Sequence, residues 1–134
     1  KFLRKNRCRN VLRNNIIYFN DAPETNNWFV ARGPVSNNCA TPILTGSGNI
    51  DGDPLFRNSG SGYGTNAVLG DYRLDDNSPC IGAGTNQSWM TGGALDIAGN
   101  DRIYPTGATA RVDIGAYEWL FYQAPLNQLR FLFW

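Results

Sequence analysis

The sequence predicts a mainly β chain, in which short strands joined by many turns stack as the coils of a solenoid. Among its 134 residues are 15 glycines, and only 17% of the residues are charged. The chain is poor in Lys and Glu, which favour helices, and rich in Asn, Gly and aromatic residues. No stretch carries apolar residues at the helical spacing i, i+3, i+4, i+7 over three turns.

Short runs of strand-forming residues recur along the chain, and each ends at Gly, Asn, Asp or Pro, which favour turns. The runs are 15–20, 28–31, 42–44, 49–50, 55–56, 67–69, 72–74, 80–81, 95–97, 102–104 and 111–114. This spacing suits a solenoid, in which each coil buries one inward row against the next. Because a free-standing stack exposes unpaired edges at both ends, we expect the chain to be the capped end of a larger stack.

Charge divides the chain into three parts. Residues 1–13 form a basic arm, which precedes the first acidic residue, Asp21. Residues 14–119 form the body, and residues 120–134 an apolar and aromatic tail. The arm is interpreted either as a contact for an anionic partner or as a solvated face or fragment boundary. A formal net charge of +1 gives no reason to expect nucleic acid as a partner.

The tail is too short and too interrupted to form a transmembrane segment. Pro125, Asn127, Gln128 and Arg130 break its apolar pattern. We expect it to cover the end of the stack, or to contact a partner or a membrane surface. Self-association through residues 120–134 is one form of such a contact.

The absence of histidine excludes several kinds of site within this chain. A Ser-His-Asp or Cys-His catalytic site and a His-ligated zinc all need the missing imidazole. The three cysteines, Cys8, Cys39 and Cys80, form no CxxC pair, so no structural zinc site is expected. An odd number of cysteines allows one disulfide and one free thiol.

One group of oxygen-bearing side chains has the spacing of a calcium loop. Asn49, Asp51 and Asp53 alternate across Gly52, and Ca²⁺ prefers such hard oxygen ligands. The alternative is a turn in which these side chains bond to their own backbone. Calcium is the only cofactor that the sequence suggests.

A second acidic group, Asp71, Asp75 and Asp76, surrounds a short strand-like run. Paired carboxylates are what glycoside hydrolysis requires, so these three are the candidate catalytic residues. The alternative is a surface ion pair, because strand alternation places Asp71 and Arg73 on one face.

Four aromatic residues are candidates for stacking on sugar rings: Trp28, Tyr63, Trp89 and Tyr104. The alternative for each is a place in the hydrophobic core.

Several motifs occur together in a characteristic order. They are NIDGDPLF (49–56), GDYRL (70–74), SPCIGAG (78–84), LDIAGNDR (95–102) and RVDIGAYE (111–118). In this order they resemble the C-terminal region of bacterial right-handed parallel β-helix proteins with pectate-lyase-like stacks, often called the choice-of-anchor Q domain. The resemblance covers about residues 14–119. Residues 15–20 look like its last regular coil, and residues 38–42 like its first irregular turn.

The resemblance implies the C-terminal coils and cap of a right-handed parallel β-helix in a secreted or surface-attached bacterial protein. Its catalytic relatives cleave acidic polysaccharides, whereas this region is a structural cap. We therefore expect a non-catalytic structural or adhesion module whose ligand is an extracellular polysaccharide. One alternative is part of a polysaccharide lyase or glycoside hydrolase with most of its groove outside this chain. Another is an assembly subunit that docks through residues 120–134.

The last motif-like stretch holds five charged residues: Asp96, Arg102, Arg111, Asp113 and Glu118. Both Asp residues stand between apolar neighbours, so they either face solvent or, where buried, need partners. We expect a structural cluster of salt bridges and hydrogen bonds that closes the cap. Cys39 and Cys80 both lie in family-like motifs and are candidates for a disulfide that clamps the cap, with Cys8 left free.

Overall fold

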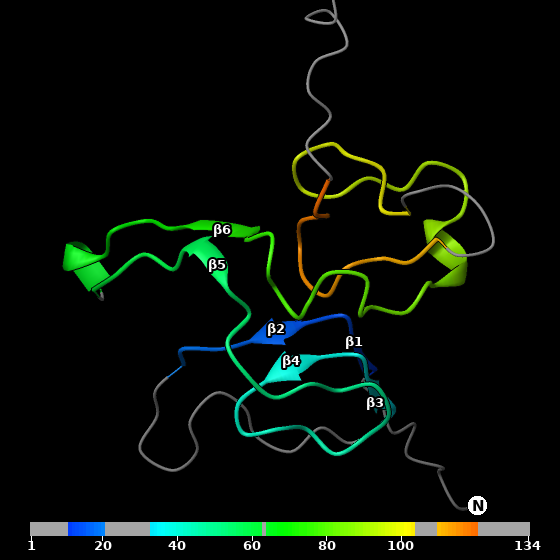
Figure 1. Ribbon diagram of the computed structural model, residues 1–134, viewed down its shortest axis with the longest axis horizontal. Coiled ribbons are helices and arrows are strands. Elements are labelled where there is room, and N and C mark those ends of the chain that lie inside the picture. The colour runs from blue at the N-terminus through cyan, green and yellow to red at the C-terminus, as the bar shows by residue number, and fades with distance from the viewer. Residues whose placement is uncertain (1–10, 21–32, 63, 104–109, 121–134) are drawn as a thin grey trace, which may run out of the picture.

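The computed structural model describes residues 11–20, 33–62, 64–103 and 110–120 (Figure 1). Its strands are short: β1 (Leu12–Arg13), β2 (Ile16–Ile17), β3 (Val35–Ser36), β4 (Cys39–Ala40), β5 (Phe56–Asn58) and β6 (Asp71–Leu74). Two 3₁₀ helices, η1 (Gly64–Asn66) and η2 (Ser88–Met90), interrupt the loops. The described residues contain no α-helix, in agreement with the mainly β expectation. None of their helices has the length and hydrophobicity needed to cross a lipid bilayer.

Parallel pairing joins successive stretches of the chain, here called passes: residues 12–17, residues 35–40 and the stretch around Ile50. β1 pairs with β3 and β2 with β4, and each residue meets a partner 23 positions further along, as Ile16 meets Cys39. A parallel bridge between Cys39 and Ile50 adds a third pass. Figure 1 shows β2 and β4 side by side in this arrangement. The first three passes of the chain therefore form a small stack of parallel rungs.

An asparagine makes the corner within each of the first two passes. Asn14 separates β1 from β2 with φ of 57°, and Asn37 separates β3 from β4 with φ of 53°. Asn enters this left-handed region more readily than most residues, because its short side chain bonds locally. The two corners also stack, since the Asn14 N–H donates to the Asn37 carbonyl at 2.9 Å.

A ladder of asparagine side chains runs through the three passes beside these corners. The Asn38 side-chain oxygen accepts from the backbone and side-chain N–H groups of Asn15, both at 3.1 Å. The Asn49 oxygen accepts from the same two groups of Asn38, at 2.9 and 3.0 Å. Asn38 is fully buried, and its amide also donates to the carbonyls of Leu12 and Ser36. The ladder thus satisfies backbone groups that the sharp corners leave unpaired.

The second unit is an antiparallel hairpin of β5 and β6. Phe56 lies opposite Leu74 and Asn58 opposite Asp71, with a register shift between them. The rings of Phe56 and Tyr72 meet edge to face, with centroids 5.4 Å apart. The hairpin extends away from the stack, with η1 near its tip (Figure 1). Its base returns to the core through Leu74, which is buried.

The hydrophobic core lies where the stack, the hairpin and the later loops meet. Its buried members are Cys39, Leu74, Cys80 and Ile114. Partly buried side chains packed against them are Ile16, Ile50, Phe56, Ile81, Ala83 and Trp119. Residues from the stack, the hairpin, the turn after β6 and residues 114–119 therefore share one core.

Two boundaries differ from the sequence-based expectation. Residues 38–42, expected as an irregular turn, contain β4, because the Cys39 N–H donates to the Asn15 carbonyl of the preceding pass. Leu12 and Arg13, assigned to the basic arm, form β1 and belong to the stack. Of the expected strands, 28–31 and position 104 lie outside the described residues, and 42–44, 80–81 and 102–103 form bends, turns or loops. The runs 49–50, 67–69, 95–97 and 111–114 each contain a single bridge residue and no strand.

Candidate functional site

Residues 110–118, here called the closing segment, run beside residues 80–86. The Ile114 N–H donates to the Cys80 carbonyl at 3.0 Å, and the Gly84 N–H donates to the Val112 carbonyl at 2.9 Å. A side chain at position 84 would meet the Val112 carbonyl at 2.7 Å, so glycine permits this close approach. Val112 and Ile114 are fully buried. The segment is therefore held by both backbone bonds and apolar packing.

Gly115 connects the closing segment to the stack. Its N–H donates to the carbonyl of Asn14, the corner of the first pass, at 3.0 Å. Its own carbonyl accepts two hydrogen bonds from the Arg102 guanidinium, at 3.1 and 3.2 Å. The residue has φ of 123°, and an added Cβ would lie 3.0 Å from Ile16 Cδ1. Glycine is thus required here by both conformation and space.

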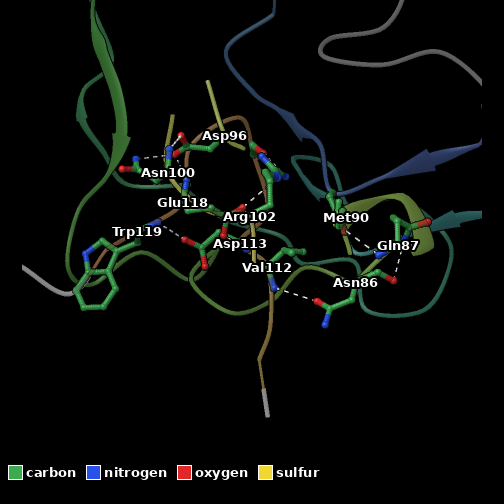
Figure 2. A network of polar contacts seen from close by, with 12 residues as sticks. Asn86, Gln87, Met90, Asp96, Asn100, Arg102, Val112, Asp113, Glu118 and Trp119 are labelled. Carbon is green, nitrogen blue, oxygen red and sulfur yellow. Dashed lines mark hydrogen bonds and ion pairs between the residues drawn. The ribbon is translucent and has the colours of Figure 1, made fainter. Parts of the chain in front are cut away.

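Arg102 lies at the centre of a buried charged cluster, which we define as Asp96, Arg102, Asp113 and Glu118 (Figure 2). Its Nε atom lies 3.2 Å from Glu118 Oε1, and both side chains are buried. Glu118 therefore forms an ion pair with the guanidinium in a poorly solvated place, and the positive charge also acts on Asp113, whereas Asp96 is buried nearby. Such an arrangement is stable only when the remaining oxygen atoms are also hydrogen-bonded.

Backbone N–H groups supply most of those hydrogen bonds. Asp96 accepts from the N–H groups of Ala98, Asn100 and Glu118 at 2.7 to 2.9 Å. Asp113 accepts from Gly82 at 2.7 Å and from the N–H of Trp119. Glu118 Oε2 accepts from the Asp113 N–H at 2.8 Å. The carboxylates thus tie three segments together, around Gly82, around Asp96 and in residues 113–119, as the dashed lines in Figure 2 show in part.

The three carboxyl groups differ in acidity because their surroundings differ. Burial raises the pKa of Glu118 to about 7, with Asp113 and Asp96 adding to the effect and Arg102 opposing it. Burial also raises the pKa of Asp113, against the N–H groups of Gly82 and Trp119. For Asp96, hydrogen bonds from Glu118 and Asn100 outweigh burial and lower the pKa. Glu118 therefore exchanges its proton with solvent near neutral pH, because its pKa is about 7.

The structure brings together four of the five charged residues that the sequence predicted to close the cap. Arg111 is the exception: it is exposed, and no ion pair joins it to a carboxylate of the described residues. Asp96 is buried while its neighbours Leu95 and Ile97 are exposed, so it faces inward and has the partners that burial demands.

The predicted calcium ligands are engaged in hydrogen bonds within the protein. The Asn49 oxygen belongs to the asparagine ladder. Asp51 accepts from the Thr41 hydroxyl at 2.6 Å, and Asp53 accepts from the Leu55 N–H at 2.8 Å. Only Asp53 bonds to the backbone of its own turn, as the alternative expected, whereas Asn49 and Asp51 accept from Asn38 and Thr41 of another segment. Calcium binding here stays a prediction.

The three candidate catalytic carboxylates have three different partners. Asp71 makes a two-point contact with Arg73 at 2.5 and 2.8 Å, and this contact holds the Asp71 pKa down at about 2. Asp75 accepts from the backbone and side-chain N–H groups of Asn77, both at 3.1 Å. Asp76 accepts from the Trp119 indole N–H at 3.1 Å. The surface ion pair that alternation predicted is present.

Of the four aromatic candidates, only Trp89 lies within the described residues. It is 64% exposed and borders a hollow of about 240 Å³ with Arg13, Gln87 and Met90. Trp28, Tyr63 and Tyr104 lie outside the described residues, as do Cys8 and residues 121–134. Cys39 and Cys80 are buried free thiols, so the disulfide stays a prediction.

An aromatic groove along the hairpin was not predicted from the sequence. Two hollows, of about 530 and 470 Å³, share Phe56 and Tyr72 as lining residues. Tyr117 lines the first hollow, and Tyr18 and Phe19 line the second. These rings come from segments far apart in the chain, and no local motif marks them. Pairing of β5 with β6 brings the two shared rings together.

No protein-family model, no curated protein and no solved structure matches this chain. The arguments for its function therefore rest on its own residues.

Proposed function

We propose that this chain is a non-catalytic structural module of a secreted or surface protein. In this proposal it forms the C-terminal coils and the cap of a right-handed parallel β-helix and ends the stack. The parallel pairing of the first two passes, at an offset of 23 residues, supports the proposal, as do the stacked Asn14 and Asn37 corners. An offset of this size is long enough for one complete coil.

The observation that carries the proposal is the double contact of Gly115. A stack of β-coils ends in unpaired backbone groups, which invite pairing with another chain. The Gly115 N–H donates to the Asn14 carbonyl at the corner of the first pass, and the Arg102 guanidinium donates to the Gly115 carbonyl. The buried charged cluster thus fixes the closing segment at this corner of the first pass, and this contact supports a capping role for the segment.

The chemistry of the cluster also favours a structural role. A general acid or base must have an oxygen within reach of the substrate. The oxygens of Asp96 and Asp113 accept backbone N–H groups instead, and Glu118 faces Arg102 and the Asp113 N–H. All three carboxylates are buried. They are placed to hold loops rather than to react.

Substitution Gly115→Ala tests the capping role. Alanine cannot adopt φ of 123° without strain, and its methyl group would lie 3.0 Å from Ile16 Cδ1. The hydrogen bond between the closing segment and the Asn14 corner should therefore break. We expect the uncovered edge to pair between molecules, so that light scattering after size-exclusion chromatography gives a higher mass than for the unsubstituted chain. Circular dichroism shows whether the variant keeps its β content.

Gly92→Ala is the matched control. Gly92 also has positive φ, at 91°, but an added Cβ there meets no atom within 4 Å. This variant should therefore carry similar backbone strain without exposing the edge. A folded Gly115→Ala variant with an unchanged mass would contradict the capping role.

The aromatic groove favours a second role, adhesion to an extracellular polysaccharide. Sugar rings present apolar faces that stack on aromatic side chains. Tyr72 is 45% exposed, borders both hollows and is held edge to face by Phe56. A ring fixed in this way loses little freedom on binding.

Co-sedimentation with acidic and neutral polysaccharides, with calcium or with chelator, tests this second role. We expect retention without new chain ends, and Tyr72→Ala should weaken it about three- to tenfold. Trp89→Ala removes an exposed ring outside the groove and should leave retention unchanged. If Trp89→Ala loses retention and Tyr72→Ala keeps it, the polysaccharide binds outside the aromatic groove. New chain ends would instead favour the lyase or hydrolase alternative.

A further inference from the structure

Two thiols from distant parts of the chain meet in the core. Cys39 lies on β4 and Cys80 in the turn after β6, and neither has any exposed surface. Both belong to the same cluster of buried side chains, and each thiol shifts the pKa of the other. The Cys39 thiol also donates to the Gly52 carbonyl at 3.4 Å. The two thiols thus lie close to each other in the core.

The two cysteines lie on either side of the contact between the stack and the closing segment. Cys39 pairs with Ile16 on one side and Ile50 on the other, at the centre of the rungs. The Cys80 carbonyl accepts from the Ile114 N–H, so Cys80 supports the closing segment. We propose that Cys39 and Cys80 form a disulfide that covalently ties the coil stack to the cap. This inference goes beyond the proposed function and does not depend on it.

The bond forms by thiol–disulfide exchange with a small-molecule disulfide such as oxidised glutathione. One cysteine, as its thiolate, attacks the small disulfide, forms a mixed disulfide and releases one small thiol. The second cysteine loses its proton, attacks the protein sulfur of the mixed disulfide and releases the other small thiol. The two cysteines give up two electrons and two protons in total, and the small disulfide is reduced to two thiols.

Either of the two cysteines can act as the attacking thiolate in this exchange. Because both thiols are fully buried, exchange requires local opening or takes place before folding is complete.

The test uses the full chain with Cys8→Ser, so that only the two buried cysteines remain. The protein is refolded from urea in a mixture of reduced and oxidised glutathione, and free thiols are then blocked with N-ethylmaleimide. Trypsin cleaves after Arg32, Arg57, Arg73 and Arg102, so the bond should link peptides 33–57 and 74–102. Adding a phosphine reductant before digestion should separate them.

Thermal unfolding of the same samples tests whether the bond acts as a clamp. Closing a loop of about 40 residues should raise Tm by about 10 °C over the reduced form. The Cys39→Ser, Cys80→Ser double variant in the same background is the control, and reductant should not change its Tm. Maleimide on both cysteines after oxidative refolding would overturn the proposal. A linked form with an unchanged Tm would overturn the clamping role.

Discussion

Replacing Arg102 by methionine is expected to lower the free energy of unfolding by about 3–5 kcal/mol at pH 7. The substitution keeps an unbranched apolar side chain but removes the positive charge of the buried charged cluster. Glu118 then loses its ion-pair partner, Asp113 loses the nearby positive charge, and the Gly115 carbonyl loses two donors. Urea unfolding followed by circular dichroism measures the loss.

Arg111→Met is the matched control for this experiment. It removes the same charge from a neighbouring, exposed position that makes no ion pair with a described carboxylate. Its effect should stay within about 0.5 kcal/mol. Adding Glu118→Gln to Arg102→Met should recover part of the loss at pH 8, because a buried carboxyl group that is costly to ionise is replaced by a neutral amide. A loss below about 1 kcal/mol in Arg102→Met would mean that water already solvates the cluster.

The free energy of unfolding that is lost in Arg102→Met should be larger at high pH than at low pH. In the unfolded chain Glu118 ionises near its usual pKa of 4.5, whereas the folded protein holds the proton up to about 7. The folded state therefore binds more protons across this window, and the contribution of Glu118 to stability falls as pH rises from about 4.5 to 7. Without Arg102 the decline continues to higher pH, so Arg102→Met should cost more at pH 8 than at pH 5.

The charged cluster could be predicted from the sequence because buried charges need partners. Asp96 and Asp113 each stand between apolar residues, which indicated either exposure or a cluster of partners. Which of the two applies was not predictable. The turn after Asp96 has N–H groups at Ala98 and Asn100 that need an acceptor, and this demand turns Asp96 inward and leaves Leu95 and Ile97 exposed.

The asparagine ladder was harder to predict, although part of its signal is visible. The pairs Asn14–Asn15 and Asn37–Asn38 stand 23 positions apart and mark two stacked corners. Asn49 follows Asn38 after only 11 positions, so the third rung breaks the period. Its place depends on the Ile50 N–H reaching the Asn38 carbonyl, a contact across the stack that no local pattern encodes.

Replacing Asn38 by leucine should lower the free energy of unfolding by about 3–5 kcal/mol, since several buried polar groups lose their partners together. The change keeps the side chain close to its original size but removes both its donor and its acceptor. The Leu12 and Ser36 carbonyls lose a donor, and the Asn15 N–H groups lose an acceptor. Urea unfolding measures the total effect.

Amide hydrogen exchange of the Asn38→Leu variant separates this account from a general loss of packing. The Asn15 N–H should exchange faster because its acceptor is gone. The Gly84 N–H donates to the Val112 carbonyl in the closing segment, so its exchange rate should change only as far as the stability of the whole fold changes. Asn66→Leu, at an exposed position in η1, should change stability by no more than about 0.5 kcal/mol. Equal acceleration of the Asn15 and Gly84 amides would mean that Asn38 stabilises the whole fold without fixing the register of the rungs. Faster exchange at Asn15 alone would show that the asparagine ladder fixes the register between successive passes.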